Sequence, residues 1–426
     1  MDLDELSLTK ALIAIDSSNP FRTIEVDGRT IGIGRETAIQ EFLATILQRN
    51  GFKVVEQVVE PGGRQLIQGQ EVTVPRRVNI VGAKGTGPSS LLFLGHVDTV
   101  DVKAGWDMDP YCAQEQVVDG QMRLYGLGAN DMKSGLAAIL CGTAAAVPDG
   151  VRIKVAFVAD EEYLSFGAEA LLATSFLDDV SLAVIPEMGE SETDPSIQWV
   201  GLGRLGRTEY LFEVEGRSCH GSDAFLAPDA VNAVHEAAKL ETRVIDYCAK
   251  LRRTLSLAGV TSTNAAYLSQ HQGGKAVLSV PDRASFIVDR TFLPDEQPEE
   301  ELAKLVQLTA SAQQDGLVDS RARLSVRERP RATPNCRPYL IDPNHPKVCW
   351  ATKVLSDLGI HWAFGVGRSV ADENRLAAKG IAPLIIGPHG GGSHTCAEWV
   401  DAESIRRVSR IYRALCEAPP ASMNMP

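Results

Sequence analysis

Residues 89–100, SSLLFLGHVDTV, hold a short continuous apolar run that ends in a histidine and an aspartate. An apolar run of this length without polar alternation is typical of a strand that is buried on both faces of a sheet. A helix-like segment follows at 135–147, GLAAILCGTAAAV, and a second apolar strand-like segment at 151–160, VRIKVAFVAD. Strands that alternate with helices in this order predict an α/β domain with a mostly parallel central sheet flanked by helices.

The α/β pattern continues toward both ends of the chain but is interrupted in the middle. From Gly206 onward the expected elements are strand, helix, strand, strand, helix and strand, with two of the strand pieces placed within 276–294. This order is typical of a ferredoxin-like α+β unit. Helix-like segments and a buried strand-like segment, IAPLIIGP, then return. We therefore expect an α/β domain formed by residues 1–206 and 331–426, with a smaller α+β domain, 207–330, inserted in it.

The composition restricts the classes of partner. The chain has 426 residues and a net charge of −13, which argues against binding to nucleic acid or to an anionic membrane, because both require a basic face. The acidic N-terminal segment predicts no signal peptide, and no apolar run reaches the roughly 20 residues of a membrane helix. The eight cysteines form no CxxC pair, which favours reduced thiols. We expect a cytoplasmic protein that acts on a small-molecule substrate.

Acidic residues and histidines follow four of the apolar strand-like segments. Ligands bind beyond the carboxyl ends of strands in open parallel sheets, so we expect these side chains to converge at one edge of the sheet. A further aspartate, Asp131, lies in a glycine-rich loop just before the helix-like segment at 135–147. The residues that follow strands are His96 and Asp98, then Asp160, Glu161 and Glu162, then Glu187, and finally His394.

Each of these groups alone has an ordinary structural explanation. His96 and Asp98 would pair in a loop, Glu161 and Glu162 would lie in the solvated first turn of a helix, and Asp131 would cap a helix. Independent loops do not explain why acids and histidines follow four separate buried strands. Two imidazoles and three carboxylates are a suitable ligand set for two divalent ions such as Zn, Co or Mn. The spare carboxylate of the Glu161–Glu162 pair is then a candidate general base.

The loop around Asp131, GLGANDMKSG at 126–135, also suggests a phosphate-binding loop, because it combines glycines with a lysine. On this alternative the chain is a metal-free protein that binds a nucleotide. The loop lacks the GxxxxGK[ST] pattern and the third glycine of a dinucleotide-binding fingerprint. We therefore interpret Asp131 as the functional residue of the loop and Lys133 as a solvated or structural residue.

Six segments of the chain resemble the motifs of one known family, in the family's order. They are GHVDTV, YGLGANDMKSGLAA, ADEEYLSFGAEAL, PEMGES and GSHTCAEWV, which are similar to its metal-site motifs, and GRSCHGSDAFLAPDAVNAV, which is similar to its lid segment. The family is the M20 group of zinc aminoacylases, carboxypeptidases and desuccinylases, which includes acetylornithine deacetylase and succinyl-diaminopimelate desuccinylase. The resemblance covers almost the whole chain. It implies a zinc-exopeptidase-like fold and a homodimer formed through the inserted domain, which also serves as a lid.

The resemblance assigns each candidate metal ligand to one of two ions. His96 and Glu162 would hold one ion, and Glu187 and His394 would hold the other, with Asp131 bridging both.

The resemblance also implies four roles outside the ligand set. Asp98 would accept a hydrogen bond from the second ring nitrogen of His96, which fixes the tautomer. Glu161 would take a proton from the attacking water and pass it to the leaving nitrogen. His220, from the inserted domain, would donate a hydrogen bond to the developing oxyanion. Arg290 would bind an anionic group of the substrate.

The activity that these roles imply is hydrolysis of a C–N bond, most simply the amide of an N-acyl amino acid, a small peptide or a related amide. Leu278 departs from the family pattern, because many members carry at this position an asparagine that orients the polar end of the substrate. Loss of that polar group favours an aromatic or apolar substrate. It also leaves open a second activity, in which a two-metal aminohydrolase releases ammonia from an amidine or from an amine on an activated aromatic ring.

Overall fold

The structure is a computed structural model of the chain, and it describes residues 3–26, 29–67, 70–148, 150–187, 194–257, 260–274 and 277–418. The chain divides into two compact units. The larger unit is formed by Met1–Gly203, Leu340–Gly367 and Ala371–Pro426. The inserted unit is formed by Arg204–Tyr339 and Arg368–Val370, whereas the insertion expected from the sequence was 207–330.

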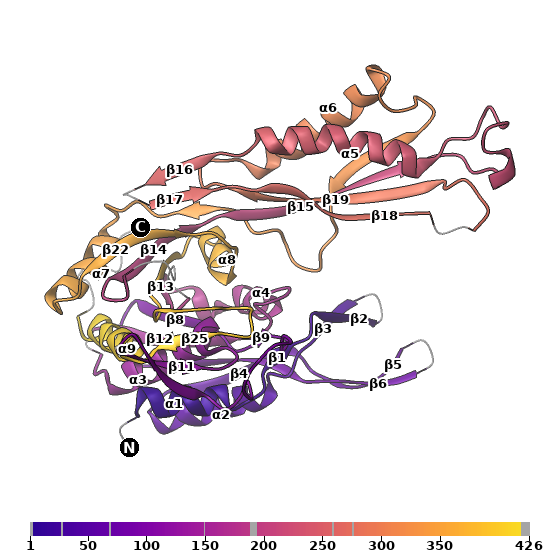
Figure 1. Cartoon of the computed structure of the whole chain (residues 1–426). Helices are drawn as coiled ribbons and strands as arrows, with labels where there is room; N and C mark the ends of the chain where they lie inside the picture. The colour runs from indigo at the N-terminus through magenta and orange to yellow at the C-terminus, as the bar shows by residue number, and fades with distance from the viewer. Residues whose placement is uncertain are drawn as a thin grey trace. The chain divides into compact units, whose positions relative to one another are not determined.

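A nine-stranded sheet forms the centre of the larger unit (Figure 1). Its strands, in spatial order, are β21 (Tyr339–Leu340), β14 (Gln198–Arg204), β23 (Ala382–Ile385), β13 (Val180–Ile185), β8 (Ser90–His96), β12 (Arg152–Val158), β7 (Arg77–Lys84) and β4 (Lys53–Glu60), and β22 (Trp362–Gly367) pairs with β14. The four strands β23, β13, β8 and β12 run parallel, whereas β14, β7 and β4 pair antiparallel with their neighbours. The predicted α/β fold is confirmed, but the central sheet is mixed where a mostly parallel sheet was expected, because antiparallel strands flank the four parallel ones.

The parallel strands place the candidate site. All seven residues of β8 are buried, as the apolar run at 89–100 predicts for a strand covered on both faces. β12 and β13 pair with β8 on its two sides, so the carboxyl ends of three neighbouring strands meet at one edge of the sheet. His96, the Glu161–Glu162 pair and Glu187 follow these three ends.

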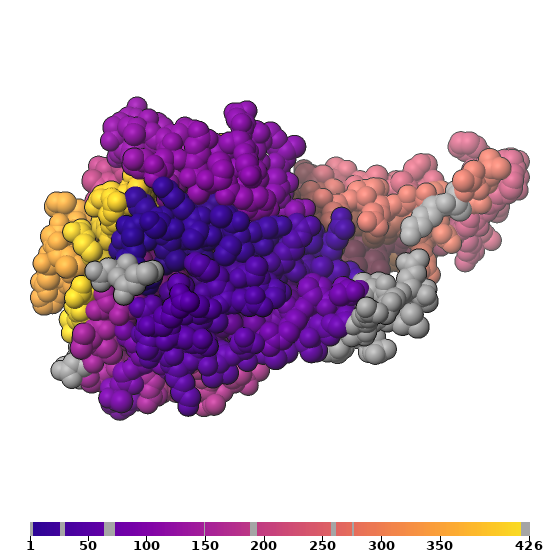
Figure 2. Space-filling model, turned by 90° about the horizontal axis from the view of Figure 1, so that it is seen from below, coloured from indigo at the N-terminus to yellow at the C-terminus, as the bar shows by residue number. Residues whose placement is uncertain are grey.

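Helices cover both faces of this sheet (Figure 1). On one face α3 (Ser134–Ala145) packs against α9 (Ala402–Glu417), and α1 (Glu5–Ile13) and α2 (Thr37–Arg49) lie beside them. On the other face α4 (Phe166–Leu172) contacts α8 (Asp372–Ala378). The helix α7 (Pro346–Asp357) packs against α9 and β22. Figure 2 shows residues from the two ends of the chain side by side on one face of the molecule, in indigo and yellow. Both ends therefore contribute to one unit.

The larger unit also contains short strands outside the central sheet, and the sequence pattern did not predict them. The larger group is a four-stranded sheet of β10 (Gln114–Val118), β11 (Gln121–Tyr125), β25 (Trp399–Asp401) and β24 (Gly390–Gly391). The two-stranded pairs are β1 (Ser18–Asn19) with β9 (Thr99–Val100), β2 (Arg22–Val26) with β3 (Arg29–Ile33), and β5 (Gly63–Ile67) with β6 (Gln70–Val74). Within the described part of the chain, we find no helix with the length and apolarity needed to cross a bilayer.

The inserted unit has the predicted ferredoxin-like arrangement. Its antiparallel sheet has the order β18 (Ala266–Gly273), β19 (Arg283–Phe292), β15 (Gly206–Glu215) and β20 (Arg323–Glu328), and the helices α5 (Ala233–Lys250) and α6 (Pro298–Gln314) pack against it. A hairpin of β16 (Thr254–Leu257) and β17 (Val260–Thr263) extends the motif.

One strand of the inserted unit was assigned to the wrong residues. The piece expected at 276–280 is not a strand in its described part, 277–280, which forms only an isolated bridge from Ser279 to His220. Its place in the sheet is taken by β18, whose residues are mostly exposed and polar. A strand with little buried surface carries little of the apolar alternation that a sequence pattern can detect.

Candidate active site

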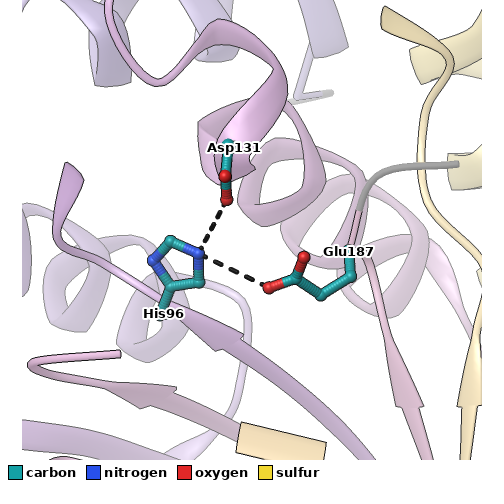
Figure 3. Close-up of side chains that lie close together, drawn as sticks. All are labelled: His96, Asp131 and Glu187. Carbon is teal, nitrogen blue, oxygen red and sulfur yellow. Dashed lines mark hydrogen bonds and ion pairs between the residues drawn. The ribbon is translucent and has the colours of Figure 1, made fainter. Parts of the chain in front are cut away.

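His96 is the last residue of β8, and its ring is held by the backbone just beyond the strand. Nδ1 lies 2.9 Å from the carbonyl oxygen of Asp98. A carbonyl oxygen only accepts, so Nδ1 carries a proton, and Nε2 is the nitrogen that would bind a metal ion. Nε2 lies 3.0 Å from Oδ1 of Asp131 and 3.6 Å from Oε1 of Glu187 (Figure 3). The carboxylate of Asp98, which was expected to hold Nδ1, lies 3.6 Å away, so the carbonyl of this residue takes that role instead.

Asp131 lies in an irregular turn, Ala129–Lys133, that leads into α3. The turn is held by a buried glutamate that the sequence analysis missed. Glu398 accepts hydrogen bonds from the backbone N–H groups of Gly128 (2.8 Å), Asn130 (2.9 Å) and Asp131 (2.9 Å). Gly128 has a φ of +75°, a conformation that favours glycine. The glycines and Glu398 therefore shape the loop that presents Asp131.

Lys133 has a structural role in this loop. Its side chain is 1% exposed, and Nζ donates a hydrogen bond of 2.8 Å to the carbonyl oxygen of Ile15. Of the two predicted alternatives, a solvated or a structural lysine, the structure shows the structural one. The ammonium group is engaged with the backbone of the same unit.

Two groups of potential metal ligands share Asp131. One contains His96, Asp131 and Glu187, and the other contains Asp131, Glu162 and His394, with the ligand atoms of each group within 4.8 Å of one another. Oδ1 of Asp131 faces His96, while Oδ2 lies 3.3 Å from Nε2 of His394. Nε2 of His394 also lies 3.0 Å from Oε2 of Glu162. The two oxygens of Asp131 thus serve different groups, as a bridging ligand requires.

This grouping corrects the pairing that the resemblance implied. Glu187 lies with His96, and Glu162 lies with His394, so the two glutamates are exchanged between the two groups. The difference follows from the distance of each residue from its strand. His96 ends β8 and Glu187 follows β13 by two residues, whereas Glu162 and His394 extend from longer turns beyond β12 and β23.

The electrostatics of both groups fit bound cations. Hydrogen bonds to Asp131 and Glu162 raise the pKa of His394 to about 10. Burial acts to raise the pKa of Asp131, but the hydrogen bonds from His394 and His96 outweigh it and hold the pKa below its usual value. Oε1 of Glu162 is buried without a hydrogen-bond partner among the described residues. Converging carboxylates with an unsatisfied buried oxygen are stabilised by a cation, and imidazole with carboxylate suits Zn, Co or Mn.

Glu161 stands beside these groups and belongs to neither of them. Its backbone N–H donates to Oδ1 of Asp98 at 3.1 Å, and the N–H of Glu162 donates to Oδ2 at 3.2 Å. Burial raises the pKa of the Glu161 carboxyl well above its ordinary value, with His96 opposing the shift and Glu187 adding to it. The Asp98 carboxylate therefore organises the turn that carries Glu161 and Glu162.

In the inserted unit, His220 is exposed on a loop. The N–H of Ser222 donates to its Nδ1 at 3.2 Å, and the Ser222 hydroxyl lies 2.7 Å from the same nitrogen. Nδ1 is therefore an acceptor, and the neutral ring carries its proton on Nε2. The carbonyl of Leu278, the residue that departs from the family pattern, accepts the N–H of Gly221 at 2.7 Å. The departure thus lies directly beside the predicted oxyanion donor, with the Leu278 side chain 74% exposed.

Arg290 lies in β19 of the inserted unit and is 3% exposed. Its guanidinium donates to Glu296 at 2.9 Å and to the carbonyl of Thr291 at 2.9 Å, and Nε lies 3.7 Å from Glu301. The positive charge is already neutralised inside the unit. This geometry favours a structural role for Arg290 over the substrate-binding role that the resemblance implied.

Comparison with known proteins identifies the family. The family model described as peptidase family M20/M25/M40 matches residues 92–418. The chain is similar to a succinyl-diaminopimelate desuccinylase of Sphingopyxis alaskensis (28% identity over 251 residues, 58% of each chain) and to an acetylornithine deacetylase of Vibrio vulnificus (30% over 204 residues, 47% of each chain). It therefore matches about half the length of these relatives. A solved tripeptidase from Staphylococcus aureus shares the fold (TM-score 0.67, 19% identity, 97% of this chain and 98% of that chain).

The matched region agrees with the motif analysis. It begins inside β8, ends just after α9, and includes all members of both potential ligand groups. The resemblance inferred from the ordered motifs is confirmed, and the chain belongs to peptidase family M20/M25/M40.

Proposed function

We propose that this protein is a two-metal hydrolase that cleaves a C–N bond, most simply the amide of an N-acyl amino acid or a small peptide. The observation that carries the proposal is the pair of ligand groups that share Asp131, next to a carboxylate, Glu161, that belongs to neither group. This separation gives the site residues for ion binding and a further residue for proton transfer.

The two ions would be held by the chain's own side chains in the observed grouping. His96, Asp131 and Glu187 would bind one ion, and Asp131, Glu162 and His394 would bind the second. Divalent ions at these positions would polarise the scissile carbonyl and increase the acidity of a water molecule.

Glu161 would transfer the proton. Its carboxylate would accept a proton from the attacking water and donate it to the nitrogen that leaves when the C–N bond breaks. The turn that carries Glu161 is held by two hydrogen bonds to Asp98, so the carboxylate is attached to an ordered part of the site. Burial favours proton acceptance at Glu161, because it raises the pKa of the carboxyl group.

His220 would donate to the oxyanion that forms when the carbonyl is attacked. The tautomer found in the inserted unit supports this role, because Nδ1 accepts from Ser222 and Nε2–H is available as a donor. We also propose that the protein forms a homodimer through the inserted unit, which light scattering of the purified protein would test.

A second candidate function is favoured by Leu278. An exposed apolar side chain beside His220 suits a substrate whose nearby surface is apolar or aromatic. A two-metal aminohydrolase that releases ammonia from an amidine, or from an amine on an activated ring, has such a substrate. Detection of ammonia, against detection of a free amino acid or carboxylate, separates the two activities.

The experiment is a substrate screen of the purified protein loaded separately with Zn, Co or Mn. The first compounds to test are N-succinyl and N-acetyl amino acids, because the similar curated proteins are a desuccinylase and a deacetylase. N-acyl derivatives with aromatic groups and di- and tripeptides complete the amide panel, and amidines test the alternative. A protein that binds no divalent ion, or whose turnover is unchanged after chelation, would contradict the proposal.

A further inference from the structure

A network of buried charges lies directly behind the candidate site. Its centre is Arg77, the first residue of β7, which is 1% exposed. The Nη2 atom of Arg77 donates to Glu36 and, at 3.0 Å, to Oδ1 of Asp160. Glu36 and Asp160 are 1% and 0% exposed. A guanidinium and two carboxylates are thus paired where solvent does not reach them.

Asn19 connects this network to the active-site turn. Its Nδ2 atom donates to Oδ1 of Asp160 at 2.8 Å and to Oδ2 of Asp98 at 3.1 Å. Its Oδ1 atom accepts the N–H of Phe21 at 3.1 Å, which fixes the orientation of the amide. Both hydrogens of the amide group are therefore used to join two carboxylates, one of the network and one of the site.

Asp98 in turn holds the functional residues in position. Its carboxylate accepts the backbone N–H groups of Glu161 and Glu162, and its carbonyl accepts Nδ1–H of His96. A continuous series of contacts therefore runs from Glu36 and Arg77 through Asp160, Asn19 and Asp98 to the candidate general base and a candidate ligand.

Stability alone does not account for charges at this depth. Removal of charges from water is costly, and apolar side chains of similar volume often stabilise a core as well as a buried ion pair does. Burial raises the pKa of Glu36 to about 7 even though the charge of Arg77 opposes this shift. The guanidinium donates charge-assisted hydrogen bonds to Glu36 and Asp160, and such bonds hold their partners more firmly than bonds between neutral groups.

We propose that Asn19 and Arg77 are positioning residues for the proposed reaction, because they fix Asp98 and, through it, Glu161 and Glu162. The expected effect on kcat rests on the proposed function, whereas the expected effect on ion affinity does not. Neither residue has a part in the chemistry itself, and the effect of each is transmitted through the carboxylate of Asp98.

The test replaces Asn19 by leucine, which has a similar volume but no hydrogen-bonding groups. The matched control is Asn264→Leu in the inserted unit. Asn264 is also buried (3% exposed), donates to a carboxylate (Glu296, 3.1 Å) and accepts a backbone N–H (Arg253, 2.7 Å), and both of these partners belong to the inserted unit. Metal binding to the apo protein is measured by calorimetry, and kcat and KM are measured on the best substrate of the screen.

For Asn19→Leu we expect the affinity for one of two ions to fall about 10- to 100-fold, and kcat to fall by a similar factor, while KM changes less than about twofold. Asn264→Leu should leave both ion affinities and kcat unchanged. Asn19→Leu with the ion affinities and kcat of the control would overturn the inference. If circular dichroism shows that Asn19→Leu is unfolded, Asn19→Ala, which adds no bulk, is measured against Asn264→Ala with the same criteria.

The metal titration keeps this inference separate from the proposed function. If the wild type binds two ions but hydrolyses no compound of the screen, the proposed function fails, and the ion affinities still decide whether Asn19 positions Glu162. Arg77→Lys is a second variant for the same titration, because lysine keeps the positive charge but lacks the planar donor geometry of the guanidinium. We expect Arg77→Lys to lose less ion affinity than Asn19→Leu, because Arg77 lies further from Asp98 in the series of contacts than Asn19 does. A larger loss of ion affinity in Arg77→Lys than in Asn19→Leu would contradict this order.

Discussion

Glu161→Gln tests the separation of ion binding from proton transfer. Glutamine has the shape of glutamate, and the backbone N–H of residue 161 can still donate to Asp98. The Glu161 side chain contributes to neither ligand group. We therefore expect the variant to bind two ions with wild-type affinity. Only the ability of the side chain to accept a proton is lost.

The expected loss in rate is set by the neighbours of Glu161. A positioned general base contributes about 10²- to 10⁴-fold to a rate. Glu187 and Glu162 both act on the Glu161 carboxyl through their charge, and both belong to ligand groups. Because neither is available as a substitute base, we expect kcat to fall by about 10³- to 10⁴-fold, or about 4 to 5.5 kcal/mol in the activation free energy.

Steady-state kinetics with elemental analysis of the same samples measure both quantities. Glu162→Gln is the matched control, since it makes the same chemical change one residue away, and we expect it to lose affinity for one ion. Two results would refute the reasoning. One is a kcat of Glu161→Gln above about a hundredth of the wild-type value, because a base is worth at least about 10²-fold. The other is a lost ion in Glu161→Gln, since it would make Glu161 a ligand.

Further changes probe other parts of the molecule. His220→Ala should lower kcat about 10²- to 10³-fold with unchanged metal content, as expected for loss of one oxyanion donor, and full activity in kinetic assays would contradict that role. Glu398→Ala leaves three buried N–H groups around Asp131 unpaired, so urea unfolding should show a loss of about 3 kcal/mol or more. Arg290→Met should destabilise the protein by about 3–5 kcal/mol, because Glu296 and Glu301 lose their buried partner. Its KM should stay within about twofold of wild type, and a larger rise in KM would restore a substrate-binding role.

The residues at the ends of β8, β12 and β13 could be found from the sequence for a physical reason. A strand buried on both faces is a continuous apolar run, so its end is visible as the first polar residue after the run. Parallel strands place all such ends at one edge of the sheet. On this reasoning the sequence alone predicts His96, Glu161 and Glu162 as site residues.

The partners that hold these residues could not be found by the same reasoning. Asn19 lies in a two-residue strand, β1, and its contacts are to residues 79 and 141 positions away. Glu398 contacts a loop about 270 positions earlier in the chain. Short polar segments carry no periodicity, and pairing over such separations depends on the completed fold. Glu398 lies in the GSHTCAEWV motif, and this position in a motif is the signal that the sequence offers for it.

The division of the chain into two units explains why the chemistry is easier to derive than the substrate. Every potential ligand and the candidate base belong to the larger unit, where buried strands dictate their positions. His220 and Leu278 belong to exposed loops of the inserted unit, where no buried pattern constrains the residue type. On the proposed function, we therefore expect substrate specificity to depend mainly on residues of the inserted unit. A single change in the inserted unit, Leu278→Asn, should shift the preference of the enzyme toward a more polar substrate. The kcat for simple amides and the metal content should stay close to the wild-type values. If the ratio of kcat/KM between polar and aromatic substrates does not change, specificity is determined by other residues.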